Sequence, residues 1–390
     1  MKEIRQLDSR YIMSTYNRQD LLLVEGKGAT ARDENGREYI DFGAGIGVNS
    51  LGYCDDGWVE AVCTQARTLQ HASNLYYTAP DAQLAELLCT RTGYRKALFC
   101  NSGAEANECA IKLARKYSFD RYGAEAGRNR ILSLKNSFHG RTVTTLAATG
   151  QEVFHNYFFP FTEGFEYAAA NDLNEVTEKL DDSFCAVIVE FIQGEGGVVP
   201  LDPAFVKELF ALCSARDILI IADEVQTGVG RTGRLLASEH FGVRPNITTL
   251  AKGLGGGLPI GAVLADERTC DVYRFGDHGT TFGGNPVVCA GALAALGRIA
   301  DEAFLSEVCR KSGWLREQLE AIPEVDGVDG MGLMLGIRLR TKKAAEVLPE
   351  CIRRGLIPLT AKEKLRLLPP LTITDGELER GVAILREVLK

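Results

Sequence analysis

The chain has 390 residues, of which 45% are hydrophobic and 25% charged, and its formal net charge at pH 7 is −8. This composition is typical of a globular protein and excludes a collagen-like, disordered or purely coiled-coil chain. The excess of acidic residues disfavours non-specific binding to nucleic acid or to an anionic membrane. No apolar run approaches the roughly 18 residues of a membrane span, and the first residues lack the apolar core of a signal peptide. We therefore expect a cytoplasmic protein.

The cysteines and histidines show no pattern of a disulfide framework or a metal site. The 11 cysteines include no C-x-x-C pair, and none of the five histidines lies within one helical turn of another. Structural zinc sites and disulfide scaffolds have closer and more regular spacings. We expect most of the thiols to be buried in the core, and we expect no metal.

Between about residues 90 and 270, β-branched apolar runs alternate with amphipathic stretches. This alternation is typical of βαβ units, so it predicts an α/β fold. We expect strands at 97–100, 131–134, 185–190, 218–223, 248–251 and 259–264. A helix should follow Asn101, because apolar residues from Ala106 to Tyr117 recur at helical spacing. From residue 286 onward the pattern becomes helical and then mixed, which predicts a second, smaller α+β domain.

The first candidate site is the segment Asn101-Ser102-Gly103-Ala104-Glu105, which joins an expected strand to that helix. Free backbone N–H groups and the helix dipole make such a junction suitable for an anion, above all a phosphate. Ser102 and Glu105 also fit a capping box, so the segment alone is compatible with a purely structural role.

Two further features stand at other strand ends. Asp223 closes the expected strand at 218–223, where α/β sheets place their ligands, although an aspartate there often only caps a helix. Lys252 follows another short apolar run and begins a glycine-rich stretch at 253–257. A lysine is usually a solvated surface residue, but dense glycines allow the backbone to pass close to a bulky planar group.

The stretch at 228–233 matches the dinucleotide pattern G-x-G-x-x-G. That fingerprint must follow a strand directly and open a helix. Here other residues intervene after the strand, and the stretch reads as a turn. We therefore exclude a nicotinamide-binding site.

An anion site at a helix start, a strand-end carboxylate and a lysine in a glycine loop together match the needs of pyridoxal phosphate. Its phosphate requires an anion site, its aldehyde a lysine amine, and its ring nitrogen a carboxylate that keeps the ring an electron sink. The three features therefore predict a pyridoxal-phosphate enzyme.

Six longer motifs agree with this prediction, at 101–115, 136–151, 193–198, 222–235, 250–265 and 278–286. Through them the chain resembles the class III (ω-amino) aminotransferases, which are pyridoxal-phosphate enzymes of fold type I. The resemblance implies a large domain with a mostly parallel central sheet over 49–285. It also implies a small α+β domain built from 1–48 and 286–390, and a homodimer that shares its active sites across the interface.

The resemblance also implies roles for single residues around the cofactor. Lys252 would carry the cofactor and move the proton, and Asp223 would pair with the pyridine nitrogen. Gln226 would contact the ring hydroxyl, while Phe138 and Val225 would lie against the two ring faces. The phosphate would be held by Ser102, Gly103, Ala104 and, from the partner subunit, Thr281. The alternatives are that Phe138 is an ordinary core residue and that Thr281 is a helix cap.

For the substrates, the resemblance implies that Arg141 holds an α-carboxylate. Arg366 would hold that of the second substrate, and Glu195 would mask Arg366 until this substrate arrives. Thr280 would touch the substrate, and Tyr16 belongs to a segment that would cover the pocket. The alternative for the two arginines is a structural salt bridge.

The implied reaction is a ping-pong transfer of the δ-amino group from N2-acetylornithine to 2-oxoglutarate, which forms glutamate within arginine synthesis. Sister activities on ornithine, succinylornithine, 4-aminobutyrate or N-succinyl-diaminopimelate remain open. So do an isomerase or aminomutase on the same fold and a non-catalytic binding protein, although Lys252 and Asp223 argue against the last.

Overall fold

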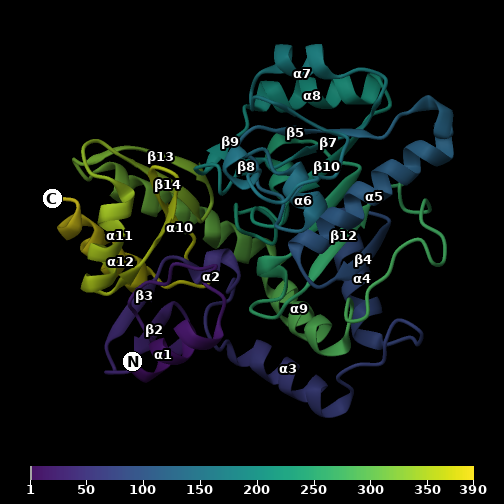
Figure 1. Ribbon diagram of the computed structural model, residues 1–390. Coiled ribbons are helices and arrows are strands. Elements are labelled where there is room, and N and C mark those ends of the chain that lie inside the picture. The colour runs from purple at the N-terminus through teal and green to yellow at the C-terminus, as the bar shows by residue number, and fades with distance from the viewer. Residues whose placement is uncertain (1) are drawn as a thin grey trace.

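The computed structural model describes residues 2–390. Figure 1 shows two lobes: the blue and green middle of the chain forms the larger one, and the purple N-terminal and yellow C-terminal segments lie together in the smaller one. We call them the large lobe and the small lobe.

The large lobe is built on a seven-stranded sheet. Its strands, in spatial order, are β4 (Lys96–Cys100), β12 (Gly261–Ala265), β11 (Ile247–Leu250), β10 (Leu219–Asp223), β7 (Phe184–Val189), β5 (Arg130–Leu134) and β6 (Phe165–Ala168). Only β12 runs antiparallel to its neighbours, so the predicted α/β fold with a mostly parallel sheet is confirmed. Six strands were predicted within a few residues. The seventh, β6, was missed because it is a four-residue edge strand and only its last residue is buried.

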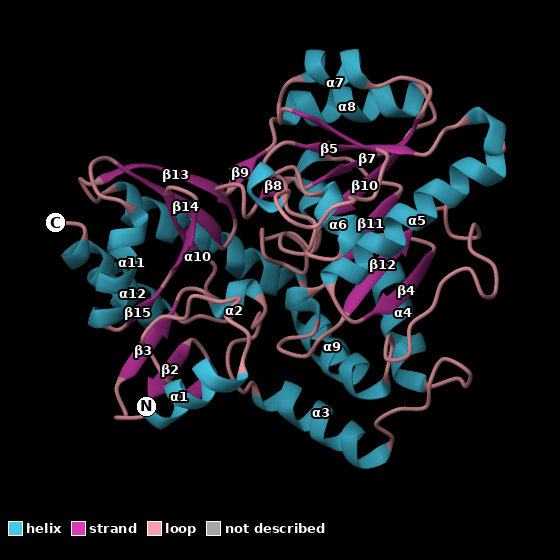
Figure 2. Cartoon of the chain, in the orientation of Figure 1, coloured by secondary structure: helices cyan, strands magenta, loops and turns pink. Residues whose placement is uncertain are grey.

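Helices cover both faces of this sheet (Figure 2). On one face lies α5 (Gly103–Tyr122), whose buried residues include the predicted apolar stripe from Ala106 to Tyr117. Alternate residues of β7 and β10, such as Ile188 and Ile221, pack on this side. Their neighbours Val187 and Ile220 pack on the other face, beside α8 (Pro203–Ala215) and α7 (Leu173–Lys179). This two-sided burial explains the continuous apolar runs of the central strands.

Further helices complete the large lobe. The helices α3 (Asp56–Thr68) and α4 (Ala79–Thr92) both pack on α9 (Pro286–Ile299). The chain also contains several short elements: α2 (Ala44–Gly47), α6 (Val143–Ala148), η1 (Ala124–Ala126), η2 (Glu152–Phe154), η3 (Ala237–Phe241), η4 (Lys252–Leu254), and the paired strands β8 (Ile192–Gln193) and β9 (Val199–Pro200).

The small lobe joins the two ends of the chain in one sheet. This sheet has the order β1 (Leu23–Lys27), β2 (Thr30–Asp33), β3 (Glu38–Asp41) and β15 (Leu356–Ile357). A second sheet has the order β13 (Val325–Met331), β14 (Met334–Leu339), β17 (Lys364–Leu367) and β16 (Leu359–Ala361). The helices are α1 (Lys2–Tyr11), α10 (Glu302–Glu320), α11 (Ala344–Arg354) and α12 (Asp375–Val388). The domain limits at 48/49 and 285/286 stay a prediction.

Three smaller observations bear on the function. In residues 2–390, no helix is both long and apolar enough to cross a membrane, and no group of three or more acidic, histidine or cysteine side chains could hold a metal ion. All 11 cysteines are free thiols and six are buried, as predicted for most of them. The stretch at 228–233 forms turns and opens no helix, so the exclusion of a dinucleotide fingerprint there is confirmed.

Candidate active site

A cavity of about 460 Å³ lies where the strands of the large lobe end and α5 begins. It collects side chains from segments far apart in the chain. Nine of the residues singled out from the sequence line it: Ser102, Gly103, Ala104, Phe138, Arg141, Asp223, Val225, Gln226 and Lys252.

One end of the cavity is the start of α5. Ser102 caps α5, because its side chain accepts a hydrogen bond from the Glu105 backbone N–H (3.1 Å). The reciprocal half of the predicted capping box differs, since the Glu105 carboxylate accepts from the Asn101 N–H (2.6 Å) instead of from the Ser102 N–H. The first-turn N–H groups of Gly103 and Ala104 have no partner within a helix and remain available to an anion. A Cβ atom on Gly103 would lie 2.7 Å from Val225 Cγ1, which explains the glycine. The segment is therefore both a cap and an anion cradle.

Asp223, the last residue of β10, is held from three sides. Its Oδ2 accepts a hydrogen bond from Asn107 Nδ2 (2.8 Å) and lies 2.8 Å from His139 Nδ1, while its Oδ1 accepts one from the Val225 N–H (3.0 Å). Thr249 in turn donates to Asn107 Oδ1 (2.7 Å). The carboxylate is buried and its orientation is fixed, as a group that must face one particular atom of a ligand requires.

Lys252 follows β11 and begins η4 with a left-handed backbone, at a φ of 41°. Such a conformation is uncommon for a residue other than glycine and often marks a functional position. Burial lowers the pKa of the Lys252 amine below its ordinary value, although Glu195 counteracts this effect. A lower pKa leaves more of the amine neutral, which is the form that reacts with an aldehyde.

Phe138 and Val225 both line the cavity, and Phe138 is anchored through its backbone. Its N–H donates to Glu190 Oε2 (3.0 Å), while the Gly194 N–H donates to Glu190 Oε1 (3.2 Å). Burial raises the pKa of Glu190 to about 7. Glu190 therefore ties together the loop that carries Phe138 and the loop that carries Glu195.

Arg366 and Glu195 do not line the cavity but form an ion pair beside one of its residues, Gln226. Arg366 Nη1 lies 2.6 Å from Glu195 Oε1 and 3.2 Å from Gln226 Oε1. Arg366 is only 3% exposed, whereas the Glu195 side chain is 31% exposed. Burial alone would raise the pKa of Glu195, but the guanidinium outweighs it and brings the pKa below the ordinary value. The pairing that the resemblance implies is present, and Gln226 connects it to the cavity.

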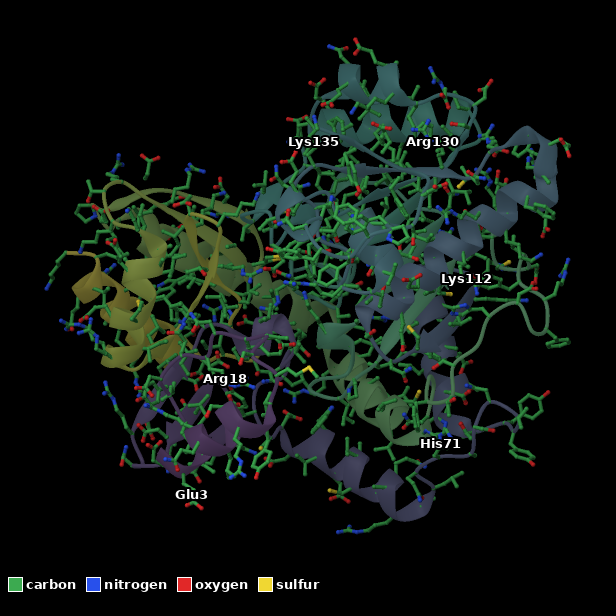
Figure 3. The ribbon with its side chains drawn as sticks, viewed as in Figure 1. Glu3, Arg18, His71, Lys112, Arg130 and Lys135 are labelled. Atoms are coloured by element: carbon green, nitrogen blue, oxygen red, sulfur yellow. The ribbon has the colours of Figure 1, made fainter. Side chains whose placement is uncertain are left out.

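The remaining predicted residues lie outside the cavity of this chain. Thr280 accepts a hydrogen bond from Asn101 Nδ2 (2.9 Å), so it lies next to a cavity residue. Thr281 lines a separate small hollow with His71, which Figure 3 labels toward the lower end of the large lobe. Tyr16 is 75% exposed and lies beneath Arg18, which the same figure labels at the small lobe.

Among the cavity residues for which the sequence predicted no role, three make hydrogen bonds that shape the site: Asn107, His139 and Glu190. His139 stands between two residues that were predicted, and Glu190 directly follows β7. Each had a local signal, but their contacts with Asp223 and with the two loops depend on strand order, which the sequence does not state.

A lysine of lowered pKa, an oriented strand-end carboxylate and an anion cradle around one cavity define a pyridoxal-phosphate-dependent enzyme. Comparison with known proteins agrees. The family model "Aminotransferase class-III" matches residues 12–389. The acetylornithine aminotransferase of Haemophilus ducreyi is 52% identical over 389 residues, covering 99% of this chain and 98% of that protein. That of Caldanaerobacter subterraneus is 46% identical, with 98% of each chain covered.

Solved structures give the same result. An ornithine aminotransferase from Toxoplasma gondii matches with a TM-score of 0.95 and 33% identity, over 100% of this chain and 94% of that one. An N-acetylornithine aminotransferase from Stenotrophomonas maltophilia matches with a TM-score of 0.85 and 37% identity, over 98% of this chain and 97% of that one. The chain therefore belongs to the class III aminotransferase family, and its cofactor is pyridoxal 5'-phosphate.

Proposed function

We propose that the protein transfers the δ-amino group of N2-acetyl-L-ornithine to 2-oxoglutarate. The products are N-acetyl-L-glutamate 5-semialdehyde and L-glutamate, and the reaction belongs to arginine biosynthesis. The observation that carries this proposal is the pair of arginines at the site: Arg141 lines the cavity and is open, while Arg366 lies beside the cavity residue Gln226 and is masked by Glu195. The names of the relatives at 42–52% identity support the donor.

The residues present fit the cofactor. Ser102, Gly103 and Ala104 would hold the phosphate at the start of α5, and Asp223 would face the ring nitrogen. Phe138 and Val225 would enclose the ring, with Gln226 at its hydroxyl. When bound, the cofactor supplies an aldehyde that takes up the amino group and a ring that withdraws electrons from the substrate carbon.

Lys252 has two tasks in this proposal. Its amine would hold the resting cofactor, and when free its Nζ would accept and return the proton that the reaction moves. Burial favours the neutral amine that both tasks need. Because Glu195 and Asp223 both favour the charged form, the amine keeps the capacity to hold the proton in transit.

The two arginines would divide the carboxylates between them. Arg141 would bind, through a bidentate contact, the carboxylate far from the reacting carbon, which is the α-carboxylate of N2-acetylornithine and the γ-carboxylate of 2-oxoglutarate or glutamate. Arg366 would bind the α-carboxylate of 2-oxoglutarate or glutamate after Glu195 has turned away. While the acylated donor is bound, the Glu195–Arg366 pair keeps the guanidinium compensated.

The protein would act as a cytoplasmic homodimer. Thr281 would reach the phosphate site of a second copy, with Thr280 beside the substrate and Tyr16 in a covering segment. Exposed apolar side chains support an interface near the Thr281 loop, since Leu75, Tyr76, Tyr77, Phe275 and Phe282 are 60–110% exposed in a single chain. Sedimentation of the purified protein would test the dimer, and a monomer that is fully active at assay concentration would contradict it.

Donor profiling at fixed 2-oxoglutarate tests the reaction. The cofactor-loaded protein is offered N2-acetylornithine, ornithine, succinylornithine, 4-aminobutyrate and N-succinyl-diaminopimelate, and glutamate and the aldehyde product are measured. We expect the highest kcat/KM with N2-acetylornithine. A higher value with another donor would assign that sister activity instead. An isomerase or aminomutase would rearrange the donor without consuming 2-oxoglutarate, and a binding protein would show no turnover.

A further inference from the structure

The guanidinium of Arg141 contacts two aromatic rings. Its Cζ atom is 4.3 Å from the ring centroid of Phe154 and 5.6 Å from that of Phe138. The two rings meet edge to face, with their centroids 5.9 Å apart and an interplanar angle of 71°. A cation within about 6 Å of an aromatic ring is attracted to the ring face, so both contacts are favourable.

These rings are the partners of Arg141 within residues 2–390, where it makes no ion pair and no side-chain hydrogen bond. Arg366 is in the opposite state, since Glu195 and Gln226 occupy its donors. An aromatic ring attracts the charge of a guanidinium but accepts no hydrogen bond from the N–H groups that point outward in the guanidinium plane. The N–H groups of Arg141 therefore remain free for a carboxylate.

Phe154 is itself tied to the loop that carries Arg141. Its N–H donates to the Gln151 carbonyl (3.0 Å), and Gln151 Nε2 donates to the Ser137 carbonyl (3.0 Å). The ring is half-buried and belongs to none of the four buried apolar clusters. Packing of the core therefore does not account for this side chain, whereas its contact with Arg141 does.

We propose that Phe154 is a positioning residue, which holds the Arg141 guanidinium in place for the carboxylate that both substrates share. The inference rests on the proposed function and adds a residue to it. It predicts that loss of the ring weakens carboxylate binding in both half-reactions. The loss should leave the cofactor in place, because Phe154 makes no contact with the phosphate cradle, Asp223 or Lys252. Phe138, which it does contact, is also held through its backbone N–H by Glu190.

The test compares Phe154→Leu, Phe154→Tyr and the control Phe158→Leu in the cofactor-loaded protein. Phe158 lies in the same loop, is 59% exposed, and has its one ring contact with Tyr157. From the usual strength of cation–π contacts, Phe154→Leu should raise KM for the donor and for 2-oxoglutarate about 3- to 30-fold, with kcat changed less. Phe154→Tyr keeps the ring, so its KM values should stay near those of the natural protein. The KM values of Phe158→Leu should also stay unchanged.

Binding of glutarate, an unreactive dicarboxylate, gives a second measurement that needs no turnover. Its Kd, measured by calorimetry, should rise by a similar factor in Phe154→Leu alone, while the visible spectrum of the bound cofactor stays unchanged in every variant. The inference is overturned if Phe154→Leu binds glutarate as tightly as Phe158→Leu does. It is also overturned if Phe154→Tyr loses as much affinity for glutarate as Phe154→Leu. If the natural protein shows no transamination, the proposed function fails, and the glutarate comparison still decides the role of Phe154.

Discussion

Replacing Glu195 by alanine should change which amino donor the enzyme prefers. In the natural protein Glu195 compensates Arg366, so a donor with one free carboxylate meets no exposed second cation. In Glu195→Ala that cation stands open at the cavity. Glutamate has a second carboxylate that can take the vacated position. Its kcat/KM as an amino donor should therefore rise relative to that of N2-acetylornithine.

The size of the effect follows from the geometry of the pair. Arg366 is 3% exposed, its Nη1 lies 2.6 Å from Glu195, and its buried Nε has no hydrogen-bond partner. Breaking a buried ion pair costs about 3–5 kcal/mol, but Glu195 is 31% exposed, so a value of about 2–3 kcal/mol is more appropriate. A free-energy difference of about 1.4 kcal/mol corresponds to a tenfold change in such a ratio. The ratio of kcat/KM for glutamate to that for N2-acetylornithine should therefore rise roughly 30- to 150-fold.

Stopped-flow conversion between the two cofactor forms measures each half-reaction separately. Arg366→Ala should show the converse result, with a KM for 2-oxoglutarate raised on the order of 100-fold and less damage to the donor half-reaction. Arg338→Ala is a matched control, because Arg338 lies on the neighbouring strand β14 and pairs with Asp329 at the surface. Exposed pairs contribute little, so this variant should behave like the natural protein.

One result would refute the reasoning. If Glu195→Ala and Arg366→Ala impair both half-reactions equally, the pair is a structural salt bridge and controls no specificity. Glu195→Gln refines the test, since it keeps a hydrogen-bond acceptor but removes the charge. It should shift the preference in the same direction as Glu195→Ala.

Three further predictions follow from single residues. Lys252→Ala should lose the visible absorption of a lysine-bound cofactor, and absence of this absorption from the reconstituted natural protein would reject the whole assignment. Asp223→Ala should keep the cofactor but lose most turnover in steady-state assays, because a ring without this partner is a poor electron sink; near-normal activity would refute the role. Burial raises the pKa of Glu224 from an ordinary 4.5 to about 7, so the proton is bound more tightly in the folded protein. The free energy of unfolding should therefore fall by roughly 2–3 kcal/mol between pH 4.5 and 7 relative to Glu224→Gln, as followed by urea denaturation, and parallel pH curves for the two proteins would contradict this.

The large lobe could be predicted well because its elements have strong local signals. The run that became β7 is apolar throughout, and that of β10 is apolar up to Asp223, which is typical of strands covered on both faces. The start of α5 was evident from Ser102, Glu105 and the apolar stripe that follows. In β6, only Ala168 is buried, so its sequence contained little to distinguish it from a loop.

The site could be predicted only where each residue has a chemical signature of its own. Lys252 and Asp223 stood out because of their neighbours in sequence. His139 and Asn107 were missed, since what singles them out is their contact with Asp223 across 84 and 116 positions of the chain. Phe154 was missed for the same reason, because one aromatic residue in an aromatic-rich loop is distinguished from the others only once Arg141 is found against its ring.

In the proposed function, the two arginines serve two tasks through different surroundings. A carboxylate present in both half-reactions needs a guanidinium that is always open, and aromatic rings hold Arg141 without occupying its donors. A carboxylate present in only one half-reaction needs a guanidinium that is compensated in the other, and a partly exposed glutamate can both pair with Arg366 and leave it. Had Glu195 been fully buried, releasing it would cost several kcal/mol, and the second substrate would have to supply that energy by binding. The 31% exposure of Glu195 beside the 3% exposure of Arg366 is therefore the arrangement that a reversible mask requires.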